Sequence, residues 1–338
     1  MIITQTPLRI GLAGGGSDLP VFCRKEQGAC INATIDKYVY VLVKKRHDDK
    51  IYLKYSENEV ADNVDDIHHD FIKEALKFME IDFGIEIINW ADIPTKGTGL
   101  GSSSSFLVGL LNALHILKGR QVGPKRLAKE ACYIEIEKCN KRIGFQDQFA
   151  VAFGGLNYMQ FWQSPDATSV TSLNYADQQL LQLSENLMMF YTGITRSATD
   201  ILSKESDHLE NNGSQQFENM KMNVSIANNL FEKLSRGDQL AIGTTLKENW
   251  ELKKTFSSKI TNKLIDRMIE VAYNKGAVGC KITGAGGGGF LLIYAPMYWH
   301  NLIKNDILEI SKSIKYMPIK IDRYGTRVLL NTEIYQWG

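Results

Sequence analysis

The amino-acid sequence predicts an α+β protein of two domains, and three observations support this prediction. The chain has 338 residues, which is long for a single ordinary core. Segments of β character and segments of helical periodicity are mixed without the regular strand–helix–strand alternation of a doubly wound sheet. Residues 163–180 are predominantly polar and indicate a boundary. We therefore expect one domain over residues 1–170 and a second over residues 171–338.

The first domain is expected to begin with strands and to continue with buried helices. Composition and periodicity predict strands over residues 7–14, 29–46, 51–56 and 84–94. They also predict a first helix over residues 69–79. Residues 103–118 are apolar nearly all round, which is typical of a helix in the middle of its domain. A further helix begins after Gly123-Pro124 and continues to about residue 141, and residues 144–162 predict a loop, a short helix and a strand.

The second domain is predicted to contain more helix than strand. The expected helices are 196–210, 215–235, 238–254, 261–275 and 297–314. Strands are expected over 187–194, 277–283 and 289–295, with a last strand near the C-terminus.

Composition and charge exclude several classes of protein. Hydrophobic residues make up 44% and charged residues 23%, with a net charge of +1, so neither a nucleic-acid partner nor an acidic tail is indicated. The N-terminal residues lack the pattern of a signal peptide, and no apolar run reaches the length of a membrane span. Five cysteines without a CxxC pair predict buried thiols in a cytoplasmic protein.

Three glycine-rich loops follow predicted strands, over residues 7–18, 94–105 and 281–290. Glycine allows the backbone to approach a ligand closely and to turn its N–H groups inward. The second loop, GTGLGSSSSF, leads into the buried helix, whose first turn has unpaired N–H groups that attract phosphate. A serine hydroxyl there could also bind Mg²⁺. A plain helix cap with small-residue packing explains one serine more easily than four.

Two common nucleotide-binding motifs do not account for these loops. A P-loop requires GK[ST], which occurs nowhere in the chain. The third loop contains GxGxxG at Gly284, Gly286 and Gly289, but it runs into a strand instead of opening a helix, which disfavours NAD binding.

In order and spacing, the three loops resemble those of the GHMP small-molecule kinases. Pro94, Gly99, Leu100, Gly101, Ser102 and Ser103 fit the family's PxxxGLGSS signature, KITGAGGGGF fits its C-terminal glycine motif, and GFQDQF resembles the segment with the galactokinase catalytic aspartate. The resemblance implies an N-terminal domain similar to a ribosomal-protein fold, a ferredoxin-like C-terminal domain, and phosphoryl transfer from ATP with Mg²⁺.

Within the family, the sequence resembles most the sugar-1-kinases that act on D-glycero-D-manno-heptose 7-phosphate. PLRIGLAGGGSDLP, TGITRSA and NWELKK carry this likeness. Galactokinases have Glu-His-Thr-Asp where this chain has Gly15, Gly16, Ser17 and Asp18, which leaves room for a bulkier sugar. The implied activity is phosphorylation of the anomeric hydroxyl, in the biosynthesis of nucleotide-activated heptose.

The resemblance also implies roles for individual residues. The ATP phosphates would lie on the second loop, at Gly97, Gly99, Gly101, Ser102, Ser103 and Ser104. Ser103 and Glu135 would hold Mg²⁺. The helical wheel independently places Glu135 on an apolar arc with Ala128 and Ala131, where a carboxylate needs a partner. A half-exposed glutamate or a buried ion pair with a lysine is the alternative.

Asp147 would act as general base or orient the sugar hydroxyl, with Arg9 beside it to keep the carboxylate ionised and to stabilise the transferring phosphoryl group. Asp18 matches the family's ligand for a sugar hydroxyl. The remaining substrate contacts would come from Gly15, Gly16, Gly286 and Gly287, with Arg196, Lys253 or Lys254 as candidates for the substrate phosphate.

Two other functions fit the same sequence. One is a kinase of this fold acting on another sugar, such as fucose or galactose. The other is a sensor that binds sugar and ATP without catalysis, which would not need Arg9, Ser103, Glu135 and Asp147 together. A homodimer is compatible with the sequence.

Overall fold

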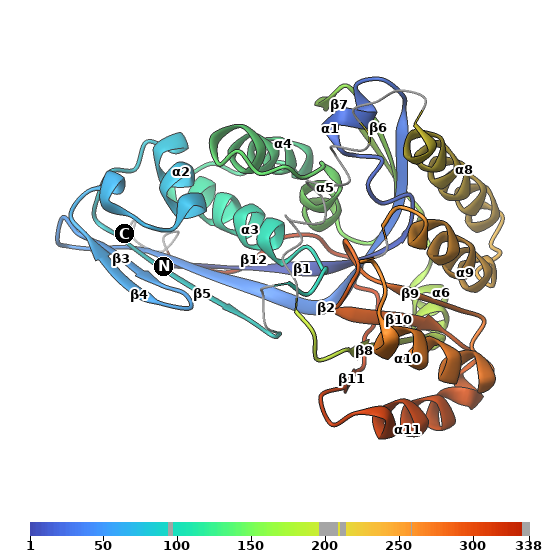
Figure 1. Cartoon of the computed structure of the whole chain (residues 1–338). Helices are drawn as coiled ribbons and strands as arrows, with labels where there is room; N and C mark the ends of the chain where they lie inside the picture. The colour runs from blue at the N-terminus through green and yellow to red at the C-terminus, as the bar shows by residue number, and fades with distance from the viewer. Residues whose placement is uncertain (94–96, 196–208, 210–213, 258, 333–338) are drawn as a thin grey trace.

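The structure is a computed structural model of the whole chain that describes residues 1–93, 97–195, 209, 214–257 and 259–332. Within these residues the strands form two sheets, one of eight strands and one of four. In Figure 1, helices α2 to α5 lie along one face of the large sheet, and α10 and α11 lie beside the small one. This mixed arrangement confirms the predicted α+β class.

The large sheet is organised around its two long strands, β1 (Ile2–Ala13) and β2 (Gly28–Lys45). Its strand order is β12-β1-β2-β5-β3-β4, and β6 pairs with β2 and β7. β2 pairs with β6 through residues 28–33 and with β5 through residues 39–45, because its 18 residues are enough for two successive partners. The other strands are β3 (Ile51–Lys54), β4 (Asn58–Ala61), β5 (Ile85–Ala91), β6 (Leu156–Trp162), β7 (Ser164–Ser172) and β12 (Arg327–Asn331).

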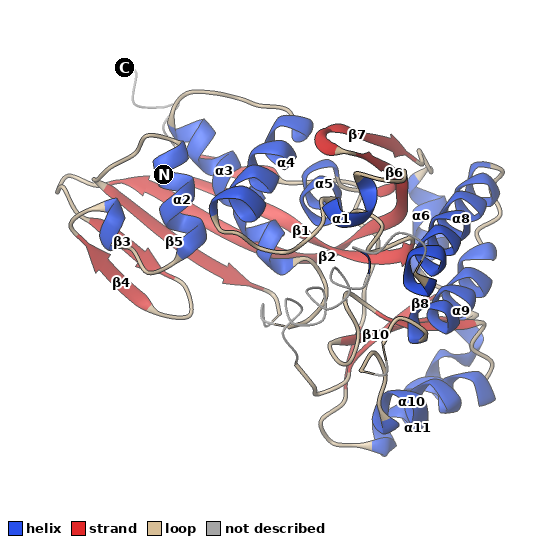
Figure 2. Ribbon diagram, turned by 45° about the horizontal axis from the view of Figure 1, so that its top comes forward, coloured by secondary structure: helices blue, strands red, loops and turns tan. Residues whose placement is uncertain are grey.

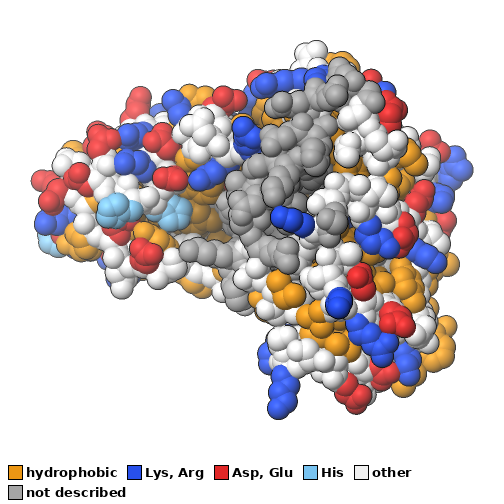
Figure 3. All heavy atoms as spheres, in the orientation of Figure 1, with side chains coloured by type: hydrophobic (Ala, Val, Ile, Leu, Met, Phe, Trp, Pro, Cys, Tyr) orange, Lys and Arg blue, Asp and Glu red, His pale blue; other side chains and the backbone are white. Residues whose placement is uncertain are grey.

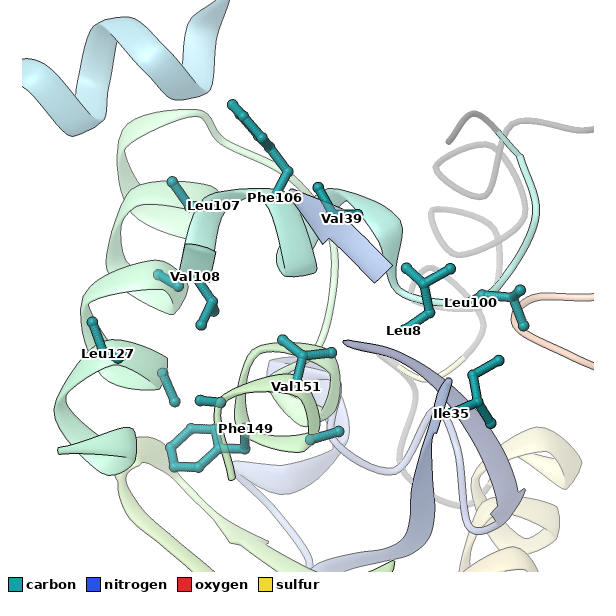
Figure 4. Packing of buried hydrophobic residues seen from close by; sticks show 14 of the residues in the cluster. Leu8, Ile35, Val39, Leu100, Phe106, Leu107, Val108, Leu127, Phe149 and Val151 are labelled. Carbon is teal, nitrogen blue, oxygen red and sulfur yellow. The ribbon is translucent and has the colours of Figure 1, made fainter. Parts of the chain in front are cut away.

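Helix α3 (Ser102–Leu117) is the central helix of this half, as its apolar composition predicts. It packs across β1 and β2. Gly109 permits the close approach, since a Cβ there would lie 2.6 Å from Thr6 Oγ1. Figure 4 shows Leu107 and Val108 among side chains of the neighbouring helices. These neighbours are α2 (Asp70–Phe78), α4 (Pro124–Cys132) and α5 (Gln146–Phe153). This half also contains two short helical segments, α1 (Pro20–Cys23) and η1 (Val64–Asp66).

The small sheet has the strand order β11-β8-β10-β9 and its own apolar core around Trp250. Its strands are β8 (Leu187–Tyr191), β9 (Gly279–Ile282), β10 (Phe290–Tyr294) and β11 (Lys315–Met317). The helices are α6 (Asp177–Ser184), α8 (Gln215–Ser235), α9 (Ala241–Lys254), α10 (Lys263–Asn274), η3 (Met297–Trp299) and α11 (His300–Ile310). Helices α8 and α9 contact β1 of the large sheet and so connect the two halves, as Figure 2 shows from a second side.

The structure differs from the predicted elements in two segments, and a third predicted element lies mostly outside the described residues. The polar segment 163–180, where we expected the domain boundary, contains β7 and the first half of α6. β7 pairs on one side only and exposes most of its side chains, which explains its polar composition. The helix expected to reach residue 141 is α-helical to Cys132 and then π-helical over η2 (Tyr133–Lys138). The helix predicted over 196–210 falls almost wholly outside the described residues.

The last described strand returns to the start of the chain. β12 pairs antiparallel with β1, with Asn331 opposite Ile2. A strand from the C-terminal part of the chain therefore belongs to the first sheet. The division into domains at residue 170 stays a proposal.

The distribution of charge on the surface and the composition of the helices are relevant to binding of nucleic acids and of membranes. On the face shown in Figure 3, the described basic and acidic side chains are interspersed. Among the described residues, no helix combines the length and the apolar composition that crossing a bilayer requires.

Candidate active site

The three glycine-rich loops come together around a cleft of about 340 Å³. This volume is in the range of small-molecule sites. The cleft lies between the two halves, since its lining includes residues from β1, α3 and α5 on one side and from α8, α9 and β9 on the other. The sequence prediction that these loops share one site is consistent with this placement.

The second and third loops touch backbone to backbone. A Cβ on Gly99 would lie 2.6 Å from the carbonyl oxygen of Thr283, and a Cβ on Gly284 would lie 2.4 Å from Gly99 Cα. Both glycines have left-handed backbone angles, with φ of +71° and +65°. Glycine is required at both positions because a side chain would separate the loops and strain the backbone.

Arg9 and Asp147 form a two-pronged ion pair at the edge of the cleft. Arg9 Nε and Nη2 each donate to one carboxylate oxygen of Asp147, at 2.7 Å. Arg9 Nη1 also donates to the carbonyl oxygen of Gly99, at 2.6 Å, which ties the pair to the second loop. The guanidinium is 6% exposed and the carboxylate 24% exposed, so Asp147 keeps access to the cleft. The neighbouring positions predicted from the sequence are confirmed for these two residues, and their catalytic roles stay a prediction.

Three of the four serines of the second loop divide between two tasks, and the fourth, Ser102, contacts Thr98 Oγ1 at 3.3 Å. Gly101, with φ of +75°, precedes α3 as its N-cap residue. Ser105 Oγ donates to the carbonyl oxygens of Pro7 and Gly101, at 2.8 and 3.0 Å, which fixes the first turn. Ser103 and Ser104 instead turn toward Glu135, and both line the cleft.

Glu135 lies in η2 and is 2% exposed. Its Oε1 accepts from Ser103 Oγ at 2.9 Å, and its Oε2 accepts from Ser104 Oγ at 2.9 Å and from Gln148 Nε2 at 2.6 Å. Burial raises its pKa to about 7, although these three hydrogen bonds act in the opposite direction. The predicted burial is confirmed. Among the described residues no lysine or arginine forms an ion pair with this carboxylate, so the alternative of a buried ion pair with a lysine is not observed.

The surroundings of Glu135 fit a divalent cation. A buried carboxylate without a cationic neighbour is costly, and a cation in the cleft would offset that cost. Ser103 and Glu135 offer adjacent hard oxygens of the kind that Mg²⁺ binds.

Asp18 also lines the cleft, where two backbone N–H groups hold its carboxylate. Its Oδ1 accepts from Gly16 N at 3.1 Å, and its Oδ2 accepts from Gln146 N at 3.0 Å. Gly144 leaves the space that the carboxylate occupies, because a Cβ there would lie 1.9 Å from Asp18 Oδ2. Burial raises the pKa of Asp18 to about 6, against the effect of the Gln146 N–H.

The first loop is also held by Asn223, which Asn249 supports, and the sequence analysis missed both asparagines. Asn223 Oδ1 accepts from Gly14 N at 3.3 Å, and Asn223 Nδ2 donates to the carbonyl oxygen of Gly15 at 2.9 Å. Asn249 Nδ2 donates to Asn223 Oδ1 at 2.5 Å. Both are buried in otherwise amphipathic helices, and a buried polar residue on an apolar face was the available signal.

The other predicted substrate contacts lie at different distances from the cleft. Gly15 and Gly16 line it, whereas Gly284 and Ala285 are the lining residues of the third loop. Gly286 and Gly287 lie further along that loop, where Gly287 N donates to the carbonyl oxygen of Ile260 at 2.7 Å. Arg196 lies outside the described residues.

Of the candidate lysines, Lys253 lines the cleft and its Nζ donates to the carbonyl oxygen of Gly284. Lys254 forms an ion pair with Glu251 at 2.7 Å. Lys281, which the sequence analysis did not single out, also lines the cleft and is 5% exposed. Burial lowers its pKa well below the ordinary value, and the positive charges of Lys253 and Arg9 act in the same direction.

Comparisons with known proteins agree with the geometry of the cleft. Residues 70–155 match the GHMP kinases N terminal domain, and residues 230–296 match the GHMP kinases C terminal domain. A D-glycero-alpha-D-manno-heptose 7-phosphate kinase from Campylobacter jejuni is 33% identical over 323 residues, which cover 90% of this chain and 92% of that protein.

Solved structures extend the likeness to the whole chain. A putative sugar kinase from Campylobacter jejuni superposes with a TM-score of 0.77 at 29% identity, covering 97% of both chains. A D-glycero-D-manno-heptose 1-phosphate kinase from Bacteroides thetaiotaomicron superposes with a TM-score of 0.80 at 23% identity, covering 98% of this chain and 99% of that one. The latter identity establishes likeness of fold alone.

Proposed function

This chain belongs to the GHMP kinases, which use ATP as phosphate donor, and on that premise we propose that it phosphorylates the anomeric hydroxyl of D-glycero-D-manno-heptose 7-phosphate. The product would be the 1,7-bisphosphate. The observation that carries the proposal is the Arg9–Asp147 pair, which faces the cleft where the three glycine loops meet. Such a pair can position a hydroxyl group and receive its proton.

Asp147 is proposed to bind the acceptor hydroxyl through its exposed edge. As the hydroxyl oxygen forms its bond to the terminal phosphorus of ATP, the bond between that phosphorus and the bridging oxygen breaks, and ADP leaves with the electron pair. The hydroxyl proton moves to the Asp147 carboxylate. Arg9 holds the carboxylate in place through two hydrogen bonds and adds positive charge beside the transferred group.

The phosphates of ATP are proposed to lie at the N-terminus of α3, where Gly101 to Ser104 present backbone N–H groups. Ser103 and Glu135 would hold Mg²⁺, which supplies neutralisation of phosphate charge when bound. Ser104 and Gln148 keep Glu135 oriented toward the cleft through their hydrogen bonds.

The substrate is proposed from the relative that is 33% identical and from the shape of the first loop. Asp18 would accept a sugar hydroxyl, and the absence of side chains at Gly15 and Gly16 leaves room for a heptose. The names of the two heptose kinases differ in the carbon that carries the phosphate, so the position of transfer must be measured.

The test is ADP release with Mg-ATP across D-glycero-D-manno-heptose 7-phosphate, the free heptose, mannose, fucose, galactose, mevalonate and homoserine. We expect the heptose 7-phosphate to have the highest kcat/KM and Asp147→Asn to lower kcat about 10²–10⁴-fold. A higher kcat/KM for fucose or galactose would replace the substrate and keep the catalytic roles. ATP binding without turnover of any acceptor would favour the alternative function, a sensor that binds sugar and ATP without catalysis.

A further inference from the structure

Lys281 is a buried lysine whose amino group has no partner in the part of the chain that the structure describes. The residue is 5% exposed, and it makes no hydrogen bond or ion pair with any described residue. Its neighbours on β9, Cys280 and Ile282, are fully buried in the apolar core of the small sheet. A lysine in such a strand costs folding free energy unless a ligand compensates for it.

Strand alternation directs Lys281 toward the cleft. Side chains two residues apart lie on the same face of a strand. Gly279 packs against α9, since a Cβ there would lie 1.8 Å from the Gly243 carbonyl oxygen, so Lys281 shares the face that meets α9 and the large sheet. Its side chain therefore enters the space between the two halves, where it lines the cleft.

The charged groups that act most directly on Lys281 are two cations. Arg9 approaches from β1 and Lys253 from α9, and both oppose protonation of Lys281. Asp147 balances Arg9. Cys30 faces the group from β2, and burial raises the pKa of this thiol well above its ordinary value, so it stays neutral. Asp18 also lines the cleft, but its carboxylate accepts from Gly16 N and Gln146 N, so no described carboxylate pairs with Lys281.

We propose that Lys281 binds phosphoryl oxygens in the cleft, as a contact to a reactant beyond the serine loop and the Arg9–Asp147 pair. The inference rests on the proposed kinase function and adds a residue that touches substrate. Two reactant groups share this chemistry, the phosphoryl group in transfer and the phosphate that the acceptor already carries. Arg9 and Lys253 would contribute to the same anion-binding surface.

The first experiment titrates inorganic phosphate at constant ionic strength into wild type, Lys281→Met and Lys281→Gln, followed by calorimetry. We expect both variants to bind phosphate about tenfold to hundredfold more weakly. Lys275→Met is the matched control, because this lysine follows α10, pairs with Asp306 of α11 at 2.8 Å and is not among the residues that line the cleft. The control should bind phosphate as wild type does.

The second readout separates a binding role from a structural one. Without phosphate, Lys281→Met should raise the melting temperature, since it replaces a buried amino group that has no described partner with an apolar chain of similar length. Phosphate affinities within twofold of wild type in both variants would overturn the proposal. A lowered melting temperature together with weaker phosphate binding would overturn it as well, because it would assign Lys281 to the core packing.

Steady-state kinetics of Lys281→Met then identify the phosphoryl source. A fall of kcat by the same factor for heptose 7-phosphate and free heptose assigns Lys281 to the group in transfer. A rise of KM for the phosphorylated acceptor alone assigns it to the acceptor's phosphate. The phosphate titration requires no acceptor, so a wild type that rejects heptose 7-phosphate would refute the proposed substrate without affecting this result.

Discussion

The contact between the second and third loops can be tested with one methyl group. Gly99→Ala places a Cβ 2.6 Å from the Thr283 carbonyl oxygen, which is 0.8 Å short of the 3.4 Å at which ordinary contact begins. Because the obstacle is backbone, the loops must separate by nearly that amount. The substitution also puts alanine at φ of +71°, a left-handed conformation that costs about 1–2 kcal/mol.

Gly119→Ala is the matched control for the conformational cost. Gly119 has φ of +69°, and a Cβ there meets nothing within 4 Å. It should lower the free energy of unfolding by about 1–2 kcal/mol and leave kcat/KM unchanged. Gly99→Ala should lower it by about 1–3 kcal/mol more, the cost typical of overpacking.

The activity of Gly99→Ala should fall further than its stability suggests. Arg9 Nη1 donates to the Gly99 carbonyl oxygen, so movement of the loop shifts the Arg9–Asp147 pair. A displacement near 1 Å at a reacting centre lowers kcat/KM about 100-fold. Urea unfolding and ADP release measure the two effects. Equal unfolding free energies for the two alanine variants, with full activity of Gly99→Ala, would refute the loop contact.

Two further predictions concern the carboxylates. Burial raises the pKa of Asp18 from 3.8 to about 6. Its contribution to the free energy of unfolding is therefore full below pH 4 and is lost as the pH rises through 6, a loss of about 3 kcal/mol. Asp18→Asn should abolish this pH-dependent loss. Urea unfolding from pH 4 to 7 measures this difference, and identical slopes in both proteins would contradict it. Ser104→Ala removes a hydrogen bond to Glu135 Oε2 and should raise the Mg²⁺ concentration for half-maximal activity about tenfold. Ser105→Ala, whose hydroxyl bonds only backbone carbonyls, should change that concentration less than twofold; equal effects would argue against a cation beside Glu135.

The local chemistry of the sequence predicts much of this site. The apolar arc of the helix that contains Glu135 placed this carboxylate inside the protein, and glycines after strands marked the three loops. The π-helical turn over 133–138 was not predictable from a wheel with fixed periodicity, although it leaves Glu135 buried. The burial of Ala128 and Ala131 shows that the wheel holds for the α-helical part.

Contacts between distant segments were harder to predict. Asn223 and Lys281 act across more than 200 residues of sequence, on the Gly14–Gly15 backbone and on the cleft beside Arg9. Their partners depend on how α8 and β9 meet the large sheet, which periodicity does not specify. A lysine between Cys280 and Ile282 in an apolar strand was the available signal. β7 was missed because a strand paired on one side needs few apolar residues.

The most direct test of the proposed function is phosphorus NMR of the product formed from heptose 7-phosphate and Mg-ATP, with Asp147→Asn in parallel. We predict one new phosphate signal coupled to the anomeric proton, with the original 7-phosphate signal retained and no product from Asp147→Asn at matched time. A new phosphate coupled to any other sugar proton, or undiminished product from Asp147→Asn, would contradict an anomeric kinase built around the Arg9–Asp147 pair.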